Sequence, residues 1–154
     1  MMPARMPEID RETERRLAAG LQGEVWRLLS LPKRRSEQDD EMLHAVHASR
    51  YHWGKVGEAI TVARAEWLCS RVYAVLGRSE PAIWHAQRHL ELLTGFGGGE
   101  NWDEAAAYEA LARAHALARD GQTNHWLARA REALQSVPDQ DQREPIEADL
   151  VSIA

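Results

Sequence analysis

The chain has 154 residues but only one cysteine, Cys69. One cysteine cannot form an intramolecular disulfide, so we expect the fold to be independent of oxidation. Cys69 lies among apolar neighbours in the segment AEWLCSRVYAVL. This setting predicts a buried, unreactive thiol rather than a nucleophile.

The sequence also lacks long apolar runs and an excess of positive charge. No run approaches the roughly 20 apolar residues that a membrane-spanning helix needs, and MMPARMPEID lacks the apolar core of a secretory signal. We therefore expect a cytoplasmic protein without a membrane partner. A net charge of −5 argues against nucleic-acid binding, and the basic run 33–35 is followed directly by the acidic SEQDDE.

Motifs of known catalytic chemistry are missing as well. The sequence contains no HExxH string, nucleophile elbow, dinucleotide fingerprint or calcium loop. The glycines of GFGGGEN, residues 95–101, follow no strand pattern, so we interpret this segment as a hinge rather than a phosphate-binding loop. The sequence therefore indicates no cofactor and does not predict an enzyme.

Helix-forming residues dominate the chain, whereas alternating β-branched runs are absent. Glycine, proline and capping residues divide it into seven expected helices, at about 7–29, 36–57, 58–76, 79–94, 102–119, 123–136 and 146–153. We expect Ser36, Ser79 and Thr123 to cap three of them. The helix at 58–76 is apolar on almost every side, which is typical of a central helix. The prediction is a single all-α domain, 1–154.

Two segments, 71–93 and 113–138, share a pattern. In each, a helix ends at a glycine turn, and a leucine follows thirteen residues after that glycine. These residues are Gly77 with Leu90, and Gly121 with Leu134.

This spacing resembles the tetratricopeptide (TPR) repeat, in which small residues let two antiparallel helices approach closely. The matching residues of the first segment are Tyr73, Gly77, Ala82 and Leu90. Those of the second are Gly121, Ala130, Ala133, Leu134 and Pro138. The sequence departs from the pattern at His89 and Trp126, which stand where the family has small residues. The stretch 44–93 is also similar to small bacterial TPR-like proteins.

The resemblance implies a right-handed stack of about three antiparallel hairpins with a short C-terminal cap. Their expected ranges are 7–53, 58–94 and 102–136, followed by the cap helix 146–153. Because the first helices of TPR hairpins line a groove, the resemblance implies a peptide-binding face there. The residues expected on this face are Arg64, Trp67, Arg71, Tyr108, His115 and Arg119. Arginine beside aromatic side chains suits an acidic or aromatic-containing peptide. The alternative places Trp67 in the core and pairs the arginines with carboxylates such as Glu66 or Asp103.

Trp84 falls on the polar side of its helix, where an exposed indole suits contact with another subunit or protein. Alternatively, the glycine hinge folds over it, so that Phe96 or Trp102 covers it.

Histidines are concentrated in HAVHASRYHW, residues 44–53, and in HAQRH, residues 85–89. On a helix His44 and His47 share one face with Tyr51, whereas Met42, Val46 and Trp53 form a separate packing face. The pairs His44 with His47 and His85 with His89 have spacings that suit one metal ion.

We therefore expect a non-enzymatic protein–protein interaction module that binds a peptide or helix in a groove, or that forms a homodimer. Two alternatives stay open. One is a metal-binding protein that uses His44, His47, His85 and His89; it resembles the DinB-type helical hydrolases and transferases. The other is a small-molecule sensor that uses the aromatic and arginine groups without chemistry.

Overall fold

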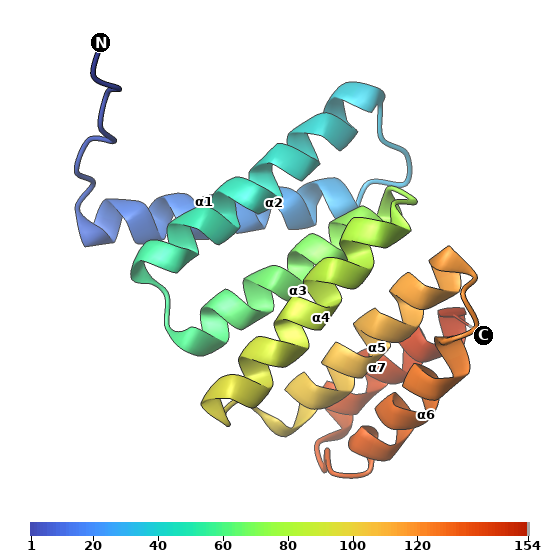
Figure 1. Ribbon diagram of the computed structural model, residues 1–154. Coiled ribbons are helices and arrows are strands. Elements are labelled where there is room, and N and C mark those ends of the chain that lie inside the picture. Colours follow the sequence, from blue (N-terminus) through green and yellow to red (C-terminus); the bar gives the residue numbers. More distant parts are fainter. Residues whose placement is uncertain (154) are drawn as a thin grey trace.

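The computed structural model describes residues 1–153, which form seven α-helices and no strand (Figure 1). The prediction of an all-α protein is therefore confirmed. The helices are α1 (Arg11–Leu29), α2 (Ser36–Val56), α3 (Ala59–Val75), α4 (Ser79–Phe96), α5 (Asn101–Ala118), α6 (Thr123–Leu134) and α7 (Gln140–Ile153).

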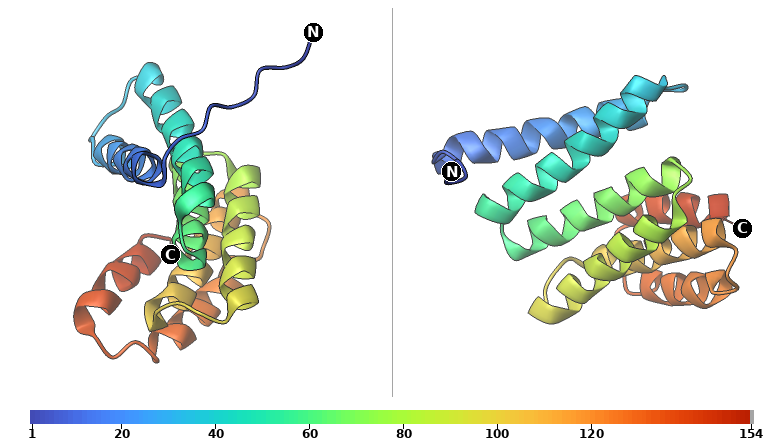
Figure 2. Two further views of the ribbon diagram at one scale, coloured as in Figure 1. Left: turned by 90° about the vertical axis from the view of Figure 1, so that its left-hand side faces the viewer. Right: turned by 45° about the horizontal axis from the view of Figure 1, so that its top comes forward.

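Consecutive helices pack as pairs: α1 with α2, α3 with α4, and α5 with α6. Contacts of α2 with α3 and of α4 with α5 join one pair to the next, and α7 folds back against α5. In the left view of Figure 2, α1 and α7 project toward the same side of the molecule, whereas α4 lies on the other side. This arrangement leaves α3 between the two projecting helices.

The core has two main parts that meet at α3. One joins the first pair of helices to α3, through Leu28, Met42 and Val72 among others. The other joins α5, α6 and α7, through side chains that include Leu111. Trp67 packs against both parts. The expectation of a central helix here agrees with the contacts of α3 with α2, α4 and α5.

The helix starts at residues 36, 79 and 123 agree with the expected ones, whereas the other four differ by one to six residues. Helix α1 begins after Asp10, whose carboxylate accepts a hydrogen bond of 2.9 Å from the backbone N–H of Thr13. Ser36, Ser79 and Thr123 are the first residues of their helices rather than the capping residues. The caps are the preceding residues, Arg35, Arg78 and Gln122.

Helix α7 begins at Gln140, six residues before the expected start at 146. Asp139 initiates it, because its carboxylate accepts a hydrogen bond of 2.9 Å from the N–H of Asp141. Pro145 lies inside the helix and removes one backbone hydrogen bond. Burial of Ile146 and Leu150 against α5 and α6 compensates for that loss, and this packing is not visible in the local sequence.

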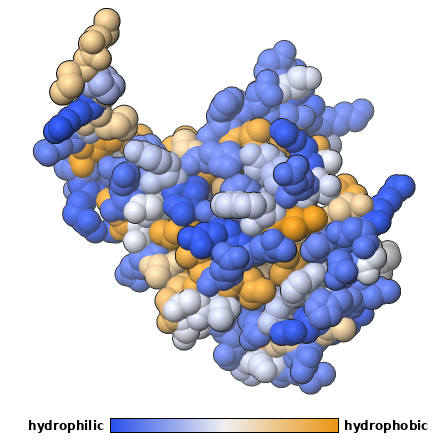
Figure 3. Space-filling model, viewed as in Figure 1, coloured by the Kyte–Doolittle hydropathy of each residue, from blue (hydrophilic) through white to orange (hydrophobic). Residues whose placement is uncertain are grey.

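None of the helices in 1–153 is long and apolar enough to cross a membrane. On the face shown in Figure 3, hydrophobic residues appear as separate patches within a mostly hydrophilic surface.

The turns after α3 and α5 each use a glycine in the left-handed region, with φ of 75° at Gly77 and 83° at Gly121. An L-residue is strained there, so Gly77→Ala should lower the free energy of unfolding by about 1 kcal/mol. Gly20→Ala is the matched control, because Gly20 lies in α1 with no atom within 4 Å of an added Cβ. It should raise the free energy of unfolding by about 0.5–1 kcal/mol. Urea denaturation measures both, and equal effects would contradict the assignment of the turn.

Candidate ligand-binding cleft

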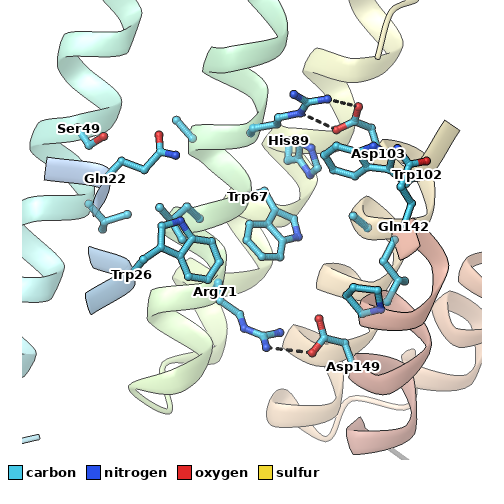
Figure 4. A pocket seen from close by; sticks show the side chains of 17 residues that line it. Gln22, Trp26, Ser49, Trp67, Arg71, His89, Trp102, Asp103, Gln142 and Asp149 are labelled. Carbon is cyan, nitrogen blue, oxygen red and sulfur yellow. Dashed lines mark hydrogen bonds and ion pairs between the residues drawn. The ribbon is translucent and has the colours of Figure 1, made fainter. Parts of the chain in front are cut away.

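A cavity of about 710 Å³ opens on the side toward which α1 and α7 project (Figure 4). Its walls come from α1, α2, α3, α5 and α7, and His89 reaches it from α4. We call this space the cleft. Its volume lies within the usual range of small-molecule sites, roughly 300–1,000 Å³.

Three tryptophans line the cleft, each from the first helix of a pair: Trp26 from α1, Trp67 from α3 and Trp102 from α5. The rings of Trp26 and Trp67 stack with their centroids 6.1 Å apart and their planes 29° apart. The guanidinium of Arg64 lies over the ring of Trp102, 4.5 Å from its centroid. The cleft therefore has flat, aromatic walls (Figure 4).

Arg64, which lies over Trp102, forms an ion pair with Asp103. Its Nε and Nη2 donate to the two carboxylate oxygens of Asp103, at 2.9 and 2.8 Å. Asp103 is buried and also accepts from the backbone N–H of Glu100 at 2.7 Å. A two-point contact of this kind is among the stronger ion pairs in proteins.

Arg71 takes part in a second ion-pair cluster, which links α3, α5 and α7. Its Nη2 donates to Oδ1 of Asp149 at 3.1 Å, and its Nη1 lies 3.6 Å from Oε1 of Glu109. Arg113 donates to the same Glu109 oxygen and to the backbone carbonyl of Asp149. Burial raises the pKa of the Glu109 carboxyl, and the neighbouring Arg113 and Arg71 oppose that rise.

Three side chains at the cleft have buried polar atoms without a hydrogen-bond partner. These atoms are Trp67 Nε1, Arg71 Nη1 and both ring nitrogens of His89. His89 is only 1 % exposed, and its burial lowers the pKa of the imidazole to about 4. It is therefore neutral near pH 7, with one donor and one acceptor to offer. Native proteins leave few buried polar groups unpaired. Trp126 Nε1, which lies outside the cleft, also lacks a hydrogen-bond partner.

The six expected groove residues divide into two sets of three. Arg64, Trp67 and Arg71 lie together in the cleft. Tyr108, His115 and Arg119 lie outside the cleft. Helix α6 packs against the face of α5 that carries Tyr108 and His115.

Tyr108 stacks on Trp126 at 5.9 Å and its hydroxyl donates to Glu104. His115 is also buried beside Trp126, with Nδ1 2.6 Å from a carboxylate oxygen of Asp120. Arg119 is exposed at the end of α5.

Sequence reasoning missed several residues of the cleft, including Trp26, Gln142 and Asp149. Trp102 was considered only as a cover for Trp84. It lies instead in the cleft under Arg64. Trp84 is 58 % exposed on α4 and Phe96 is itself exposed, so the glycine hinge does not cover the indole.

The histidines considered as metal ligands come together only in part. The rings of His47 and His85 lie 5.4 Å apart, whereas His44 is exposed and His89 lines the cleft. Nε2 of His47 lies 2.7 Å from the hydroxyl of Tyr73. Burial lowers the pKa of His47, and neighbouring His85 adds to this effect.

Among residues 1–153, three potential ligand atoms lie within 4.8 Å of one another only at Glu66, Cys69 and His85. Both oxygens of Glu66 already have partners, Arg50 at 2.8 Å and His85 at 2.6 Å. Burial raises the pKa of the Cys69 thiol to about 12. The geometry is that of a buried ion-pair cluster in which the thiol keeps its proton.

Comparisons with known families, curated proteins and solved structures find no match to this chain.

His89 makes stability depend on pH. Its folded pKa of about 4 lies below the ordinary value of 6.5, so the unfolded chain binds a proton more readily between these values. The contribution of neutral His89 to the free energy of unfolding is therefore fully present above pH 6.5 and is lost as the pH falls toward 4. From this residue alone we expect a loss of about 2 kcal/mol between pH 7 and pH 5. Between pH 7 and pH 5 the free energy of unfolding of His89→Leu, measured by urea denaturation, should fall by about this much less than that of the wild type. An equal fall in both proteins would contradict the low pKa assigned to His89.

Proposed function

We propose that the protein is a non-enzymatic binding module of TPR-like architecture, and that the cleft is its ligand site. The observation that carries this proposal is the pair of cleft residues, Trp67 and His89, whose buried ring nitrogens lack a hydrogen-bond partner beside one cavity. A molecule that pairs with these atoms removes the unfavourable free energy of leaving them without a partner. The tryptophan walls supply apolar contact to the same molecule.

Two features support the TPR-like assignment. The turn glycines Gly77 and Gly121 adopt the left-handed backbone that such a hairpin turn requires. In addition, the first helices of the three pairs contribute Trp26, Trp67 and Trp102 to one hollow side. In the TPR family this is the side on which ligands bind.

The shape of the cleft favours a compact small molecule over a long peptide. Helix α7 presents Gln142, Pro145, Ile146 and Asp149 to the cleft and so occupies part of the hollow side. The arginines expected to bind an acidic peptide are already paired, Arg64 with Asp103 and Arg71 with Asp149. We therefore propose a sensor or carrier of a small ligand, in which this helix closes one end of the site.

Filling the cleft from its rim tests this function. Gln142→Trp places a large side chain at an exposed position that lines the cleft, so it should abolish ligand binding without unfolding the chain. Gln135→Trp is the matched control, because Gln135 is exposed at the end of α6 and does not line the cleft. Saturation-transfer NMR with a mixture of small aromatic compounds measures binding.

We expect the same bound compounds for the wild type and Gln135→Trp, and none for Gln142→Trp. Equal binding by all three proteins, or no binding by any, would remove the support for a ligand site in the cleft.

A second candidate is self-association through the outer face of α4, and Trp84 favours it. Its side chain is 58 % exposed, which is unusual for an indole without a partner. Glu80 and Arg88 lie one helical turn before and after it on the same face. Two copies of α4 that cross antiparallel at Trp84 would place Glu80 of each opposite Arg88 of the other, where Arg88 would exchange its contact with Glu91 of its own helix. Such a face is complementary to itself, as a two-fold dimer requires.

Sedimentation equilibrium tests the dimer. The wild type should show a concentration-dependent dimer, and Trp84→Gln should be monomeric over the same range. Val151→Gln is the control, because it also replaces an exposed apolar side chain, 75 % exposed, but on α7. It should keep the dimer, and a wild type that stays monomeric throughout would exclude this candidate.

A further inference from the structure

The charged side chains of the cleft lie in pairs of opposite sign. Arg64 faces Asp103, and Arg71 faces Asp149. Behind them the buried Glu109 is shared by Arg71 and Arg113. A ligand with a net charge would lose hydration on entering the cleft without finding a free counter-charge. The pairing therefore favours an uncharged ligand.

The walls favour a flat ligand. The indoles of Trp26 and Trp67 form one stacked wall, and Trp102 with Arg64 above it forms a second flat surface. Planar rings lose little conformational entropy on binding and bury a large area against such faces.

The unpartnered polar atoms define where the ligand needs hydrogen-bonding groups. Trp67 Nε1 can only donate, and it is buried. Arg71 Nη1 lies 3.6 Å from Oε1 of Glu109, so its charge already has a counter-charge. Neutral His89 can present either a donor or an acceptor, depending on its tautomer. A ligand that satisfies this set carries acceptor oxygens or nitrogens, of which a carbonyl group is the strongest uncharged example.

We infer that the cleft binds a flat, uncharged ring compound with carbonyl-type acceptors, which hydrogen-bond to Trp67 and His89. This inference rests on the proposed function, because it specifies the ligand of the same cleft. It differs from the chemistry expected from the sequence, in which the arginines bind acidic groups.

Three two-ring probes separate the requirements: coumarin, which is flat and neutral with a carbonyl; naphthalene, which is flat and neutral without acceptors; and coumarin-3-carboxylate, which is anionic. Dissociation constants are measured by equilibrium dialysis at pH 7.5. The carboxylate should bind at least tenfold more weakly than coumarin, because it brings a charge into a cleft whose charges are already paired.

Two substitutions test the hydrogen bonds independently. Trp67→Phe keeps an aromatic ring but removes the Nε1 donor, and His89→Phe keeps a ring of similar size but removes both nitrogens. Each should weaken coumarin binding threefold or more while changing naphthalene binding less than twofold. His125→Phe is the control, because His125 is exposed on α6 and does not line the cleft. It should leave the binding of all three probes unchanged.

The outcomes distinguish this inference from the function on which it rests. Carboxylate binding as tight as that of coumarin, or equal losses of coumarin and naphthalene in both variants, would overturn the ligand class. The wild type could instead bind other aromatic compounds but not coumarin, with Gln142→Trp abolishing that binding. This result would overturn the ligand class but would support the cleft as a ligand site. If His89→Phe does not fold, Trp67→Phe alone decides. If no compound of any kind binds the wild type, both proposals fail.

Discussion

The Glu109 carboxylate, 2 % exposed within α5, is the group on which the form of the cleft depends. A buried carboxylate is stable only with close cations, and Arg71 and Arg113 supply them. Both arginines also contact Asp149, so the same cluster fixes α7 to α3 and α5. Together with the burial of Ile146 and Leu150, this cluster holds the helix that closes one end of the hollow side.

The pairing of charges also determines what remains available to a ligand. Arg64 and Arg71, the two cations of the cleft, each have a carboxylate partner. The groups without a partner are the neutral imidazole of His89 and the indole N–H of Trp67. A site with paired charges, apolar walls and a few unpaired polar atoms suits recognition of a neutral molecule, because these atoms orient it while the walls supply most of the buried area.

The sequence predicts features that are determined within a single helix or turn, such as which residues share one face of a helix. The spacing of Arg64, Trp67 and Arg71 places them on one face of α3, and the structure finds all three in the cleft. The same reasoning assigned Tyr108, His115 and Arg119 to the groove, but which face of α5 is free depends on where α6 packs. Trp26, His89 and Asp149 reach the cleft from helices distant in sequence, so no local pattern could combine them. The start of α7 was missed because Pro145 reads as a helix breaker, whereas burial of Ile146 and Leu150 outweighs its effect.

The most direct test of the account uses the indole N–H signals of the protein, which has six tryptophans. In ¹⁵N–¹H spectra recorded during a titration with coumarin, the signals of Trp26, Trp67 and Trp102 should shift together and saturate. Those of Trp84, on the outer face of α4, and of Trp126, packed on Tyr108, should stay in place. Saturable shifts at Trp84 or Trp126 with none at the three cleft tryptophans would contradict the assignment of the cleft as the ligand site.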